Sequence, residues 1–531
     1  MSGKDAFFMT SPRDDAGIHH ARLLRAAWAA CMPGAEPALR DVALEIEGDH
    51  IATVNAGQRF DATALPELDC TKVPEARRLL VPALANAHDH ARTYRSSTLG
   101  GSGLPLEAWL PLLSLLPGVD PYLVAATSLA RSVRRGATAV MVHYTRMQGT
   151  VPPVDEALSV ARAARDVGIR IGFAVSLRDQ QPLAYCPDEV VLAKLRPTIR
   201  EAISRRLAAP PPPISVQLER FAQIAEAIEH DPSLAPHVTV QLGPTAVQWC
   251  TPALLEQVAR ISAEQTRPVH MHMFETRYQR EWADEQFPQG MVHWLDSIGL
   301  LSPRLTLAHC TWARPDELEL LAERGVTIAV NTSSNLHLRS GIAPVAAMRA
   351  AGCRIAMGLD GLAFDEDDDG LREMRLAGAL HRGFGFEADW SDASLWQFAS
   401  ATGRRSVIGA VRDDAQPGGR LAPGSAADLL VLDLNRLDGD FGLIPGVDPS
   451  APLMARANAD AIAAVIAGGQ VRVRDGRVTG VDEPALCEEL ASRTRSAIAA
   501  DVHWLSWRDT LGQFAEDLGP FYRGRHFLGC C

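Results

Sequence analysis

Short apolar runs alternate with longer amphipathic segments through the central part of the chain. The runs are rich in Val, Ile and Ala, and each is followed by a segment of helical length. Strands that alternate with helices in this way predict a parallel sheet. The eight runs cover residues 79–87, 137–145, 169–177, 237–244, 267–274, 304–311, 326–333 and 353–361.

Eight such units over about 300 residues match a closed (β/α)8 TIM barrel. We therefore predict an α/β fold with the barrel over residues 80–400. An open doubly wound sheet is the alternative, but no GxGxxG motif follows the first run, so a dinucleotide-binding fold has little support. The third unit carries the largest insertion, at about residues 178–236, and its proline run 210–213 is interpreted as a stiff spacer.

The segments on either side of the barrel show the period-two alternation of β-strands. Residues 22–79 and residues 401–482 both contain short alternating runs that break at Gly or Asp. Neither segment is long enough to form a complete domain, so we predict that both chain ends combine in one small β-sandwich domain. Residues 483–531 have a helical pattern and become aromatic, which predicts a C-terminal helical extension packed on the body or on a second subunit.

Composition excludes several classes of protein. The 531 residues carry 52 basic and 64 acidic side chains, a formal net charge of −12, which argues against nucleic-acid binding through a broad basic surface. The nine cysteines include no CxxC pair, and no apolar run reaches the length of a membrane span. The N-terminus is a poor signal peptide. We expect a cytoplasmic protein with a small-molecule substrate and neither a membrane nor a nucleic-acid partner.

Polar side chains gather where four of the predicted strands end. His88 and His90 follow the first strand, and they point the same way because strand side chains alternate with period two. In a barrel the strand ends meet at one mouth, where barrel enzymes keep their chemistry. Clustered imidazoles and carboxylates there favour a divalent metal. The corresponding residues after the fifth, sixth and eighth strands are His270, His272, Glu275, His309 and Asp360.

Five motifs together resemble the amidohydrolase superfamily, in the branch that holds cytosine and guanine deaminases, S-adenosylhomocysteine deaminase and the triazine chlorohydrolases. The resemblance covers roughly residues 37–480 and implies a barrel with a sandwich domain and a metal-dependent hydrolase. The motifs are PALANAHDH (82–90), HMFET (272–276), LAHCTWARPDE (307–317), SSNLHLRSGIAPV (333–345) and MGLDG (357–361).

The resemblance implies a set of metal ligands. His88 and His90 match the paired first-strand ligands, and His272 matches the fifth-strand ligand. Asp360 matches the aspartate that touches both the metal and the nucleophile. His270 is the rival of His272, because it lies two residues earlier on the same face, but the family spacing His-x-x-Glu favours His272.

The number of metals follows from the lysines, which are only Lys4, Lys72 and Lys194. Binuclear relatives often bridge two metals with a carboxylated lysine from the fourth strand, and the fourth run here has none. We therefore expect one divalent metal per subunit. Three imidazoles and a carboxylate suit zinc, with iron as the alternative.

Glu275 and His309 match the proton-handling pair of the family. Together with Asp360 they imply that water attacks an sp2 carbon of a small heterocycle and that ammonia or an amine leaves. One alternative is hydrolysis of an amide, carbamate, urea or carbon–halogen bond in a xenobiotic. The remaining alternative is a non-catalytic scaffold, which the complete set of ligands disfavours.

Substrate specificity is expected to reside in the loops at the barrel mouth. The acidic run 365–369 follows the last strand; we interpret it as a solvated loop that could also select the charge of the substrate. The family resemblance further suggests a homo-oligomer, often a dimer. The candidate substrate-binding residues are Arg92, Trp109, Arg178, Gln248, Trp249 and Asn335.

Overall fold

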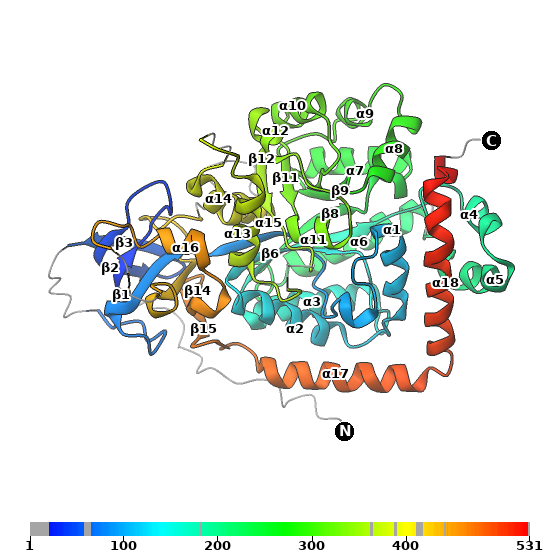
Figure 1. Ribbon diagram of the computed structural model, residues 1–531. Coiled ribbons are helices and arrows are strands. Elements are labelled where there is room, and N and C mark those ends of the chain that lie inside the picture. Colours follow the sequence, from blue (N-terminus) through cyan, green and yellow to red (C-terminus); the bar gives the residue numbers. More distant parts are fainter. Residues whose placement is uncertain are drawn as a thin grey trace.

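The computed structural model is shown in Figure 1. Cys530 and Cys531, for which no motif was recognised, lie outside the described residues, as does Lys4. The structure describes residues 21–57, 65–180, 183–361, 365–386, 390–409, 418–439, 442 and 444–528.

Eight parallel strands form the centre of the molecule, and each pairs with the next in chain order. All eight residues of the second of these strands are buried, as expected where helices cover the outside of a parallel sheet and side chains fill its inside. The predicted TIM barrel is confirmed. The strands are β5 (Leu84–Asp89), β6 (Ala137–Tyr144), β7 (Arg170–Leu177), β8 (Val238–Pro244), β9 (Val269–Met273), β10 (Leu305–His309), β11 (Thr327–Val330) and β12 (Arg354–Met357).

The seam between the last and the first barrel strand is bridged by backbone hydrogen bonds. The N–H of Asp360 donates to the carbonyl of His88 at 2.8 Å, and the N–H of Leu359 approaches the same carbonyl at 3.2 Å. The side-chain oxygen of Asn86 also accepts from the Leu359 N–H at 2.9 Å. The chain segment after β12 is thereby fixed against the end of β5.

Helices surround the barrel on its outside (Figure 1). Their ends follow local sequence signals: the Asp120 carboxylate accepts from the N–H of Tyr122 at 2.9 Å at the start of α2, and Gly168 ends α3 with φ of 82°. The main helices are α2 (Pro121–Arg134), α3 (Pro153–Val167), α6 (Ile214–Glu229), α7 (Pro252–Gln265), α8 (Arg277–Gln286), α9 (Met291–Ser297), α10 (Pro315–Glu323), α12 (Val345–Ala350), α13 (Gly370–His381) and α14 (Asp392–Ala399).

One further helix, α15 (Ala401–Ile408), covers the end of the barrel where the strands begin. The side-chain amide of Gln241 donates to the carbonyls of Ser406 and Val407 at 3.1 and 3.0 Å. The hydroxyls of Thr306 and Ser406 lie 2.7 Å apart. This helix begins at the residue where we expected the second sandwich segment to start, and it contacts the barrel.

The two chain ends build a second, mixed sheet of eight strands, as expected from their alternating patterns. Its central contact is the antiparallel pair β4–β13, in which Leu80 faces Val431. The order along the sheet is β16-β15-β14-β13-β4-β1-β2-β3. The strands are β1 (Arg22–Ala29), β2 (Leu39–Glu47), β3 (His50–Ala56), β4 (Arg78–Pro82), β13 (Leu429–Asp433), β14 (Ile462–Ala467), β15 (Gln470–Arg474) and β16 (Arg477–Val478).

The first apolar run, residues 79–87, differs from the prediction of a single barrel strand. It forms two strands, since β4 ends at Pro82 in the mixed sheet and β5 begins at Leu84 in the barrel. The run is continuous in hydrophobicity because every residue of both strands is buried. A change from one sheet to the other leaves no polar break in such a run.

The insertion and the C-terminal extension lie next to each other on one side of the barrel (Figure 1). The insertion contains α4 (Asp188–Lys194) and α5 (Pro197–Leu207), and the extension consists of α17 (Glu483–Ala500) and α18 (Trp504–Arg523). The extension packs on the body of its own chain. Within the described parts of the chain, every helix is too short or too polar to cross a membrane.

The acidic run 365–369 differs from the solvated loop expected from its sequence. Asp368 and Asp369 are buried. Arg131 Nε lies 2.8 Å from an Asp368 carboxylate oxygen, and Asp369 accepts from the N–H of Ala459 at 2.9 Å. Asp369 therefore joins the barrel to the C-terminal part of the mixed-sheet domain, and Arg131 compensates the cost of burying the charge of Asp368 within the barrel.

Gly358, two residues before Asp360, provides a test of how closely the segment after β12 packs against β5. A Cβ on Gly358 would lie 2.0 Å from Asn331 Oδ1 and 2.8 Å from the Cβ of His88, so Gly358→Ala must displace one of them. We expect it to lower the thermal unfolding midpoint by an amount equivalent to about 1–3 kcal/mol.

The matched control is Gly512→Ala, on an exposed position of α18 where a Cβ meets no atom within 4 Å. Alanine should stabilise the helix there by about 0.5–1 kcal/mol. Thermal melts of both variants check the pair, and an unchanged midpoint for Gly358→Ala would contradict the packing described here.

Candidate metal centre and active site

Three barrel strands deliver imidazoles and a carboxylate to one point at the mouth. The ring centroid of His88 lies 5.0 Å from that of His90 and 4.7 Å from that of His272. Asp360 Oδ1 lies 3.3 Å from His88 Nε2 and 3.0 Å from His90 Nε2. The predicted ligands from β5, β9 and β12 therefore converge without a large gap between them.

The hydrogen bonds of the ring nitrogens orient two of these histidines. Nδ1 of His90 lies 2.6 Å from the carbonyl of His143, and Nδ1 of His272 lies 2.7 Å from the carbonyl of Thr245. A carbonyl only accepts, so Nδ1 carries the proton and Nε2 keeps its lone pair. Each ring thus turns Nε2, the atom that a metal requires, toward the centre, where Asp360 Oδ1 lies 3.0 Å from Nε2 of His90.

The charge state of the histidines also suits metal binding. Burial lowers the pKa of His88 to about 3 and lowers the pKa of His90 and His272 below the ordinary value. These imidazoles are neutral at neutral pH and available as ligands.

His270 belongs to a different group of histidines. It lies deeper in the barrel, its ring is stacked on that of His88 at 4.9 Å, and its Nε2 is 3.3 Å from the carbonyl of Ala87. His88, His143 and His270 form a second compact set of nitrogens. Of the two rivals, His272 lines the cavity and His270 does not.

Glu275 and His309 face each other beside this centre. His309 Nε2 lies 3.7 Å from Glu275 Oε2 and has no hydrogen-bond partner among the described residues. Its Nδ1 lies 2.9 Å from Asn335 Oδ1, which fixes the ring. Burial, followed by the charges of Asp360 and Glu107, raises the pKa of Glu275 well above its usual value, which favours the protonated form of this carboxyl.

The backbone is strained at these strand ends. His309, at the end of β10, has φ of 74°, and Asp360, just after β12, has φ of 55°. Residues with a Cβ rarely adopt this left-handed region, at a cost of about 1–3 kcal/mol each. Such strain persists where the surroundings over-determine the geometry, and here it lies at two of the predicted catalytic residues.

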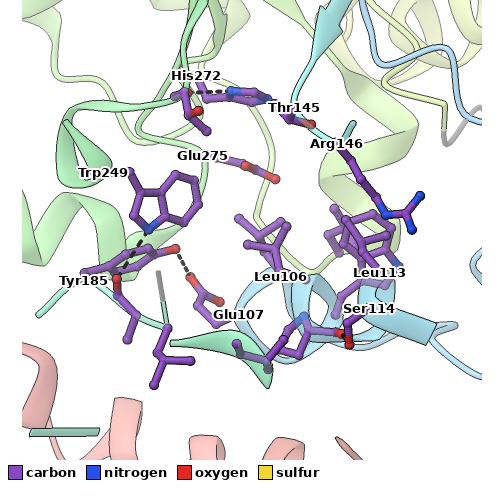
Figure 2. A pocket seen from close by; sticks show the side chains of 18 of the residues that line it. Leu106, Glu107, Leu113, Ser114, Thr145, Arg146, Tyr185, Trp249, His272 and Glu275 are labelled. Carbon is purple, nitrogen blue, oxygen red and sulfur yellow. Dashed lines mark hydrogen bonds between the residues drawn. The ribbon is translucent and has the colours of Figure 1, made fainter. Parts of the chain in front are cut away.

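A cavity of about 350 Å³ opens from the centre. His90, His272, Glu275 and Asp360 line its inner end, and Figure 2 shows His272 and Glu275 facing the space above Leu106 and Glu107. The volume falls in the range of small-molecule sites. The chemistry inferred from the sequence is therefore located at a cavity that a small substrate could enter.

Four of the six candidate substrate-binding residues line this cavity: Arg92, Trp109, Arg178 and Trp249. The guanidinium of Arg92 lies over the ring of Trp109 at 5.5 Å, and that of Arg178 lies over Trp249 at 5.3 Å. Gln248 and Asn335 are buried but outside the lining.

The structure also adds a carboxylate that sequence reasoning missed. Glu107, in α1 (Leu106–Trp109), lines the cavity and is buried. One of its oxygens accepts from Tyr185 Oη at 2.9 Å and from Thr276 Oγ1 at 2.6 Å, while Oε2 has no partner among the described residues. Burial raises the pKa of this group. The sequence signal that could have identified Glu107 is its position two residues before Trp109, a predicted substrate-binding residue.

No lysine of the described chain lines the cavity. The end of β8, where binuclear relatives were expected to carry a carboxylated lysine, contains Pro244 and is followed by Thr245. Of the lysines, Lys72 and Lys194 are described, and neither reaches the centre. The described lysines therefore supply no bridging ligand at the centre.

Comparisons with known proteins agree with this geometry. A 5-methylthioadenosine/S-adenosylhomocysteine deaminase of Nitratidesulfovibrio vulgaris strain DP4 is 30% identical over 473 residues, covering 88% of this chain and 95% of that protein. A 5'-deoxyadenosine deaminase of Methanothermobacter thermautotrophicus is 26% identical over 426 residues, covering 79% of this chain and 87% of that protein.

Solved structures show the same fold. A zinc-bound adenosine deaminase from Xanthomonas campestris superposes with a TM-score of 0.68 at 23% identity, covering 90% of this chain and 98% of that one. The atrazine chlorohydrolase of Arthrobacter aurescens TC1, complexed with zinc, gives 0.70 at 21% identity, covering 90% and 99%. The Amidohydrolase family model matches residues 79–472. The barrel and the convergence of the predicted ligands agree with this match, and the chain belongs to the amidohydrolase family.

Proposed function

We propose that this enzyme is a metal-dependent deaminase, which hydrolyses an exocyclic C–N bond of a heterocyclic amine and releases ammonia or an amine. The observation that carries the proposal is the position of Glu275, which lines the cavity with Asp360 and lies 3.7 Å from His309 Nε2. Burial raises its pKa, which favours a carboxyl that can donate a proton. A ring nitrogen needs such a proton before an amine can leave. The two curated proteins reported above are named as deaminases of adenosine derivatives, and these names favour a purine nucleoside as substrate.

We assign the metal to His88, His90, His272 and Asp360. The Nδ1 hydrogen bonds of His90 and His272 leave Nε2 of both rings as the ligand atom, and Asp360 Oδ1 lies within 3.3 Å of Nε2 of His88 and His90, as a shared metal site requires. Three imidazoles and one carboxylate suit zinc best, with Fe²⁺ as the alternative. We propose one ion per subunit, because the mouth offers no bridging lysine. A bound divalent ion would make hydroxide available near neutral pH.

The proton transfers are assigned to three side chains. Asp360 and His309 take the proton of the attacking water, and His309 is kept in position by Asn335. Glu275 gives its proton to the ring nitrogen next to the reacting carbon. The tetrahedral intermediate then collapses, the C–N bond breaks, and the leaving amine departs with a proton.

Recognition of the substrate is assigned to the rest of the lining. Trp109 and Trp249 offer flat faces for a ring, and Arg92 and Arg178 are held against them. The unpartnered Oε2 of Glu107 is an acceptor for a hydroxyl or amino group of the substrate.

We also propose that the protein is a cytoplasmic homodimer.

The function is tested by ammonia release from purified, zinc-loaded protein with purine, pyrimidine, pterin and triazine substrates. We expect ammonia from at least one aminopurine nucleoside. Amine or halide release from ureas, anilides or chlorotriazines, without ammonia from any heterocyclic amine, would replace deamination by the alternative hydrolytic activities.

His272→Ala is expected to abolish metal binding, because it removes one of three imidazole ligands. His270→Ala is the matched control: the histidine is two residues away on the same strand, and its loss should leave at least half of the metal bound. Metal content per protein is measured by elemental analysis after gel filtration. Retention of metal in His272→Ala with loss in His270→Ala would reverse the assignment.

Glu275→Gln should keep the metal while turnover falls by about 100-fold or more, because the amide cannot transfer the proton. The control is Glu319→Gln, the same change at an exposed position of α10, for which both metal content and kcat should match the parent. Full activity of Glu275→Gln would remove the carboxyl from the mechanism.

A further inference from the structure

The segment after β11 contacts the metal centre through a serine. A short helix, α11 (Thr332–His337), follows β11 after one residue. The hydroxyl of Ser334, in the first turn of α11, donates to Asp360 Oδ2 at 2.6 Å. The other carboxylate oxygen, Oδ1, lies within 3.3 Å of His88 Nε2 and His90 Nε2. The two oxygens of Asp360 therefore have different neighbours, and Ser334 binds the one that faces away from the histidines.

The same turn of α11 contacts a second residue of the centre. Asn335, next to Ser334, places its Oδ1 2.9 Å from His309 Nδ1. Ser334 and Asn335 are both buried. One helical turn therefore contacts both Asp360 and His309, so a displacement of α11 would change the positions of both.

A buried carboxyl group binds the start of α11. Glu373, on α13, accepts from the N–H of Ser333 at 2.8 Å and also from the Ser333 hydroxyl. Both residues are buried. Burial raises the pKa of Glu373 to about 7, whereas hydrogen bonds from Ser333 and from the backbone of Thr332 lower it. The donors at the start of α11 thus offset the cost of burying this carboxyl group.

Glu373 lies outside the set of residues that line the cavity. Its contact with the centre runs by way of Ser333 and Ser334. The helix that carries it has a fixed start, because the Asp369 carboxylate accepts from the N–H of Arg372 at 3.1 Å in the first turn of α13. A change at Glu373 is therefore expected to affect the centre through α11 and not through contact with a substrate.

We propose that Glu373 is a positioning residue of the metal centre, which acts through Ser334 to hold Asp360 in the orientation that a metal ion requires. The inference rests on the proposed function for the identity of the metal ligands. Glu373 binds the first turn of α11, and this turn presents Ser334 to Oδ2 of Asp360, so that Oδ1 stays with the histidines. Loss of a partner that orients a metal ligand typically costs about 10–100-fold in metal affinity or activity.

The test measures zinc affinity, which does not depend on turnover. Metal-free protein is titrated with zinc against a competing chelator at pH 8, above the pKa of about 7 of Glu373. Ser334→Ala removes the hydroxyl that binds Asp360, and Glu373→Gln replaces one accepting oxygen by a donor. We expect each variant to lower the zinc affinity by about tenfold.

The double variant separates action through Ser334 from a general loss of structure. If Glu373 acts through Ser334, Glu373→Gln has nothing further to remove once that hydroxyl is gone. The double variant should then also lose about tenfold, whereas two independent effects would multiply to about 100-fold.

The matched control is Glu156→Gln, at another buried glutamate. Glu156, on α3, accepts from the hydroxyl of Tyr144 at 2.7 Å and from the N–H of Gly149 at 3.0 Å. It therefore binds the same kinds of donor, but in the loop after β6. We expect Glu156→Gln to leave the zinc affinity within about twofold of the parent.

Cobalt in place of zinc gives a spectroscopic measure of the same contact. The visible absorption band of bound Co²⁺ depends on the geometry of its ligands. We expect Ser334→Ala and Glu373→Gln to shift this band in the same direction, because both release the same oxygen of Asp360. The band of Glu156→Gln should match that of the parent.

The outcomes distinguish this inference from the proposed function. A loss of about 100-fold in the double variant would overturn the positioning role, as would a parent-like zinc affinity and cobalt band in Glu373→Gln or an equal loss in Glu156→Gln. Equal losses in both single variants and the double variant, in a parent protein that releases no ammonia from any heterocycle, would support the positioning role and refute deamination.

Discussion

Closure of the barrel is the constraint on which the whole site depends. The proposed ligands come from strands that are far apart in the chain, and they meet only because the segment after β12 is bonded to the end of β5. The hydrogen bond from the Asp360 N–H to the His88 carbonyl, at 2.8 Å, joins two of these residues through the backbone. The left-handed conformation of Asp360 is maintained by this closure.

Burial then determines the chemistry of the groups that closure brings together. Exclusion of water lowers the pKa of the imidazoles at the centre, and the same exclusion raises the pKa of the Glu275 carboxyl. The same desolvation therefore favours the neutral form of both kinds of group within one cavity. Neighbouring groups such as Asn335 and Thr245 fix the ring orientations, so that each nitrogen faces the partner that its protonation state requires.

Sequence patterns predicted the barrel because its strands are short, wholly buried runs separated by helical segments. They also located His88, His272 and Asp360, since a residue at a strand end has a defined place in a barrel. Glu107 escaped prediction because it lies in a short helix of a loop, where no periodicity indicates direction.

Long-range packing was the other limit of the sequence. The burial of Asp368 depends on Arg131, a partner distant in the chain, and the composition of an acidic run contains no sign of such a pair. The contact of Glu373 with Ser333 likewise depends on where α13 packs against the barrel. The division of residues 79–87 between two sheets was hidden because both strands are equally buried.

The pairing of β4 with β13 has a consequence for folding of the chain during its synthesis on the ribosome. Leu79 lies opposite Leu432, and at about 5–20 residues per second the intervening chain takes roughly 20–70 s to synthesise. During that interval strands β1 to β4 of the mixed sheet lack their partner β13. The barrel strands, which lie between β4 and β13 in the sequence, are synthesised in the same period. The apolar face of the N-terminal strands is therefore exposed in the nascent chain until β13 emerges, and the second sheet is completed only after the barrel has been synthesised.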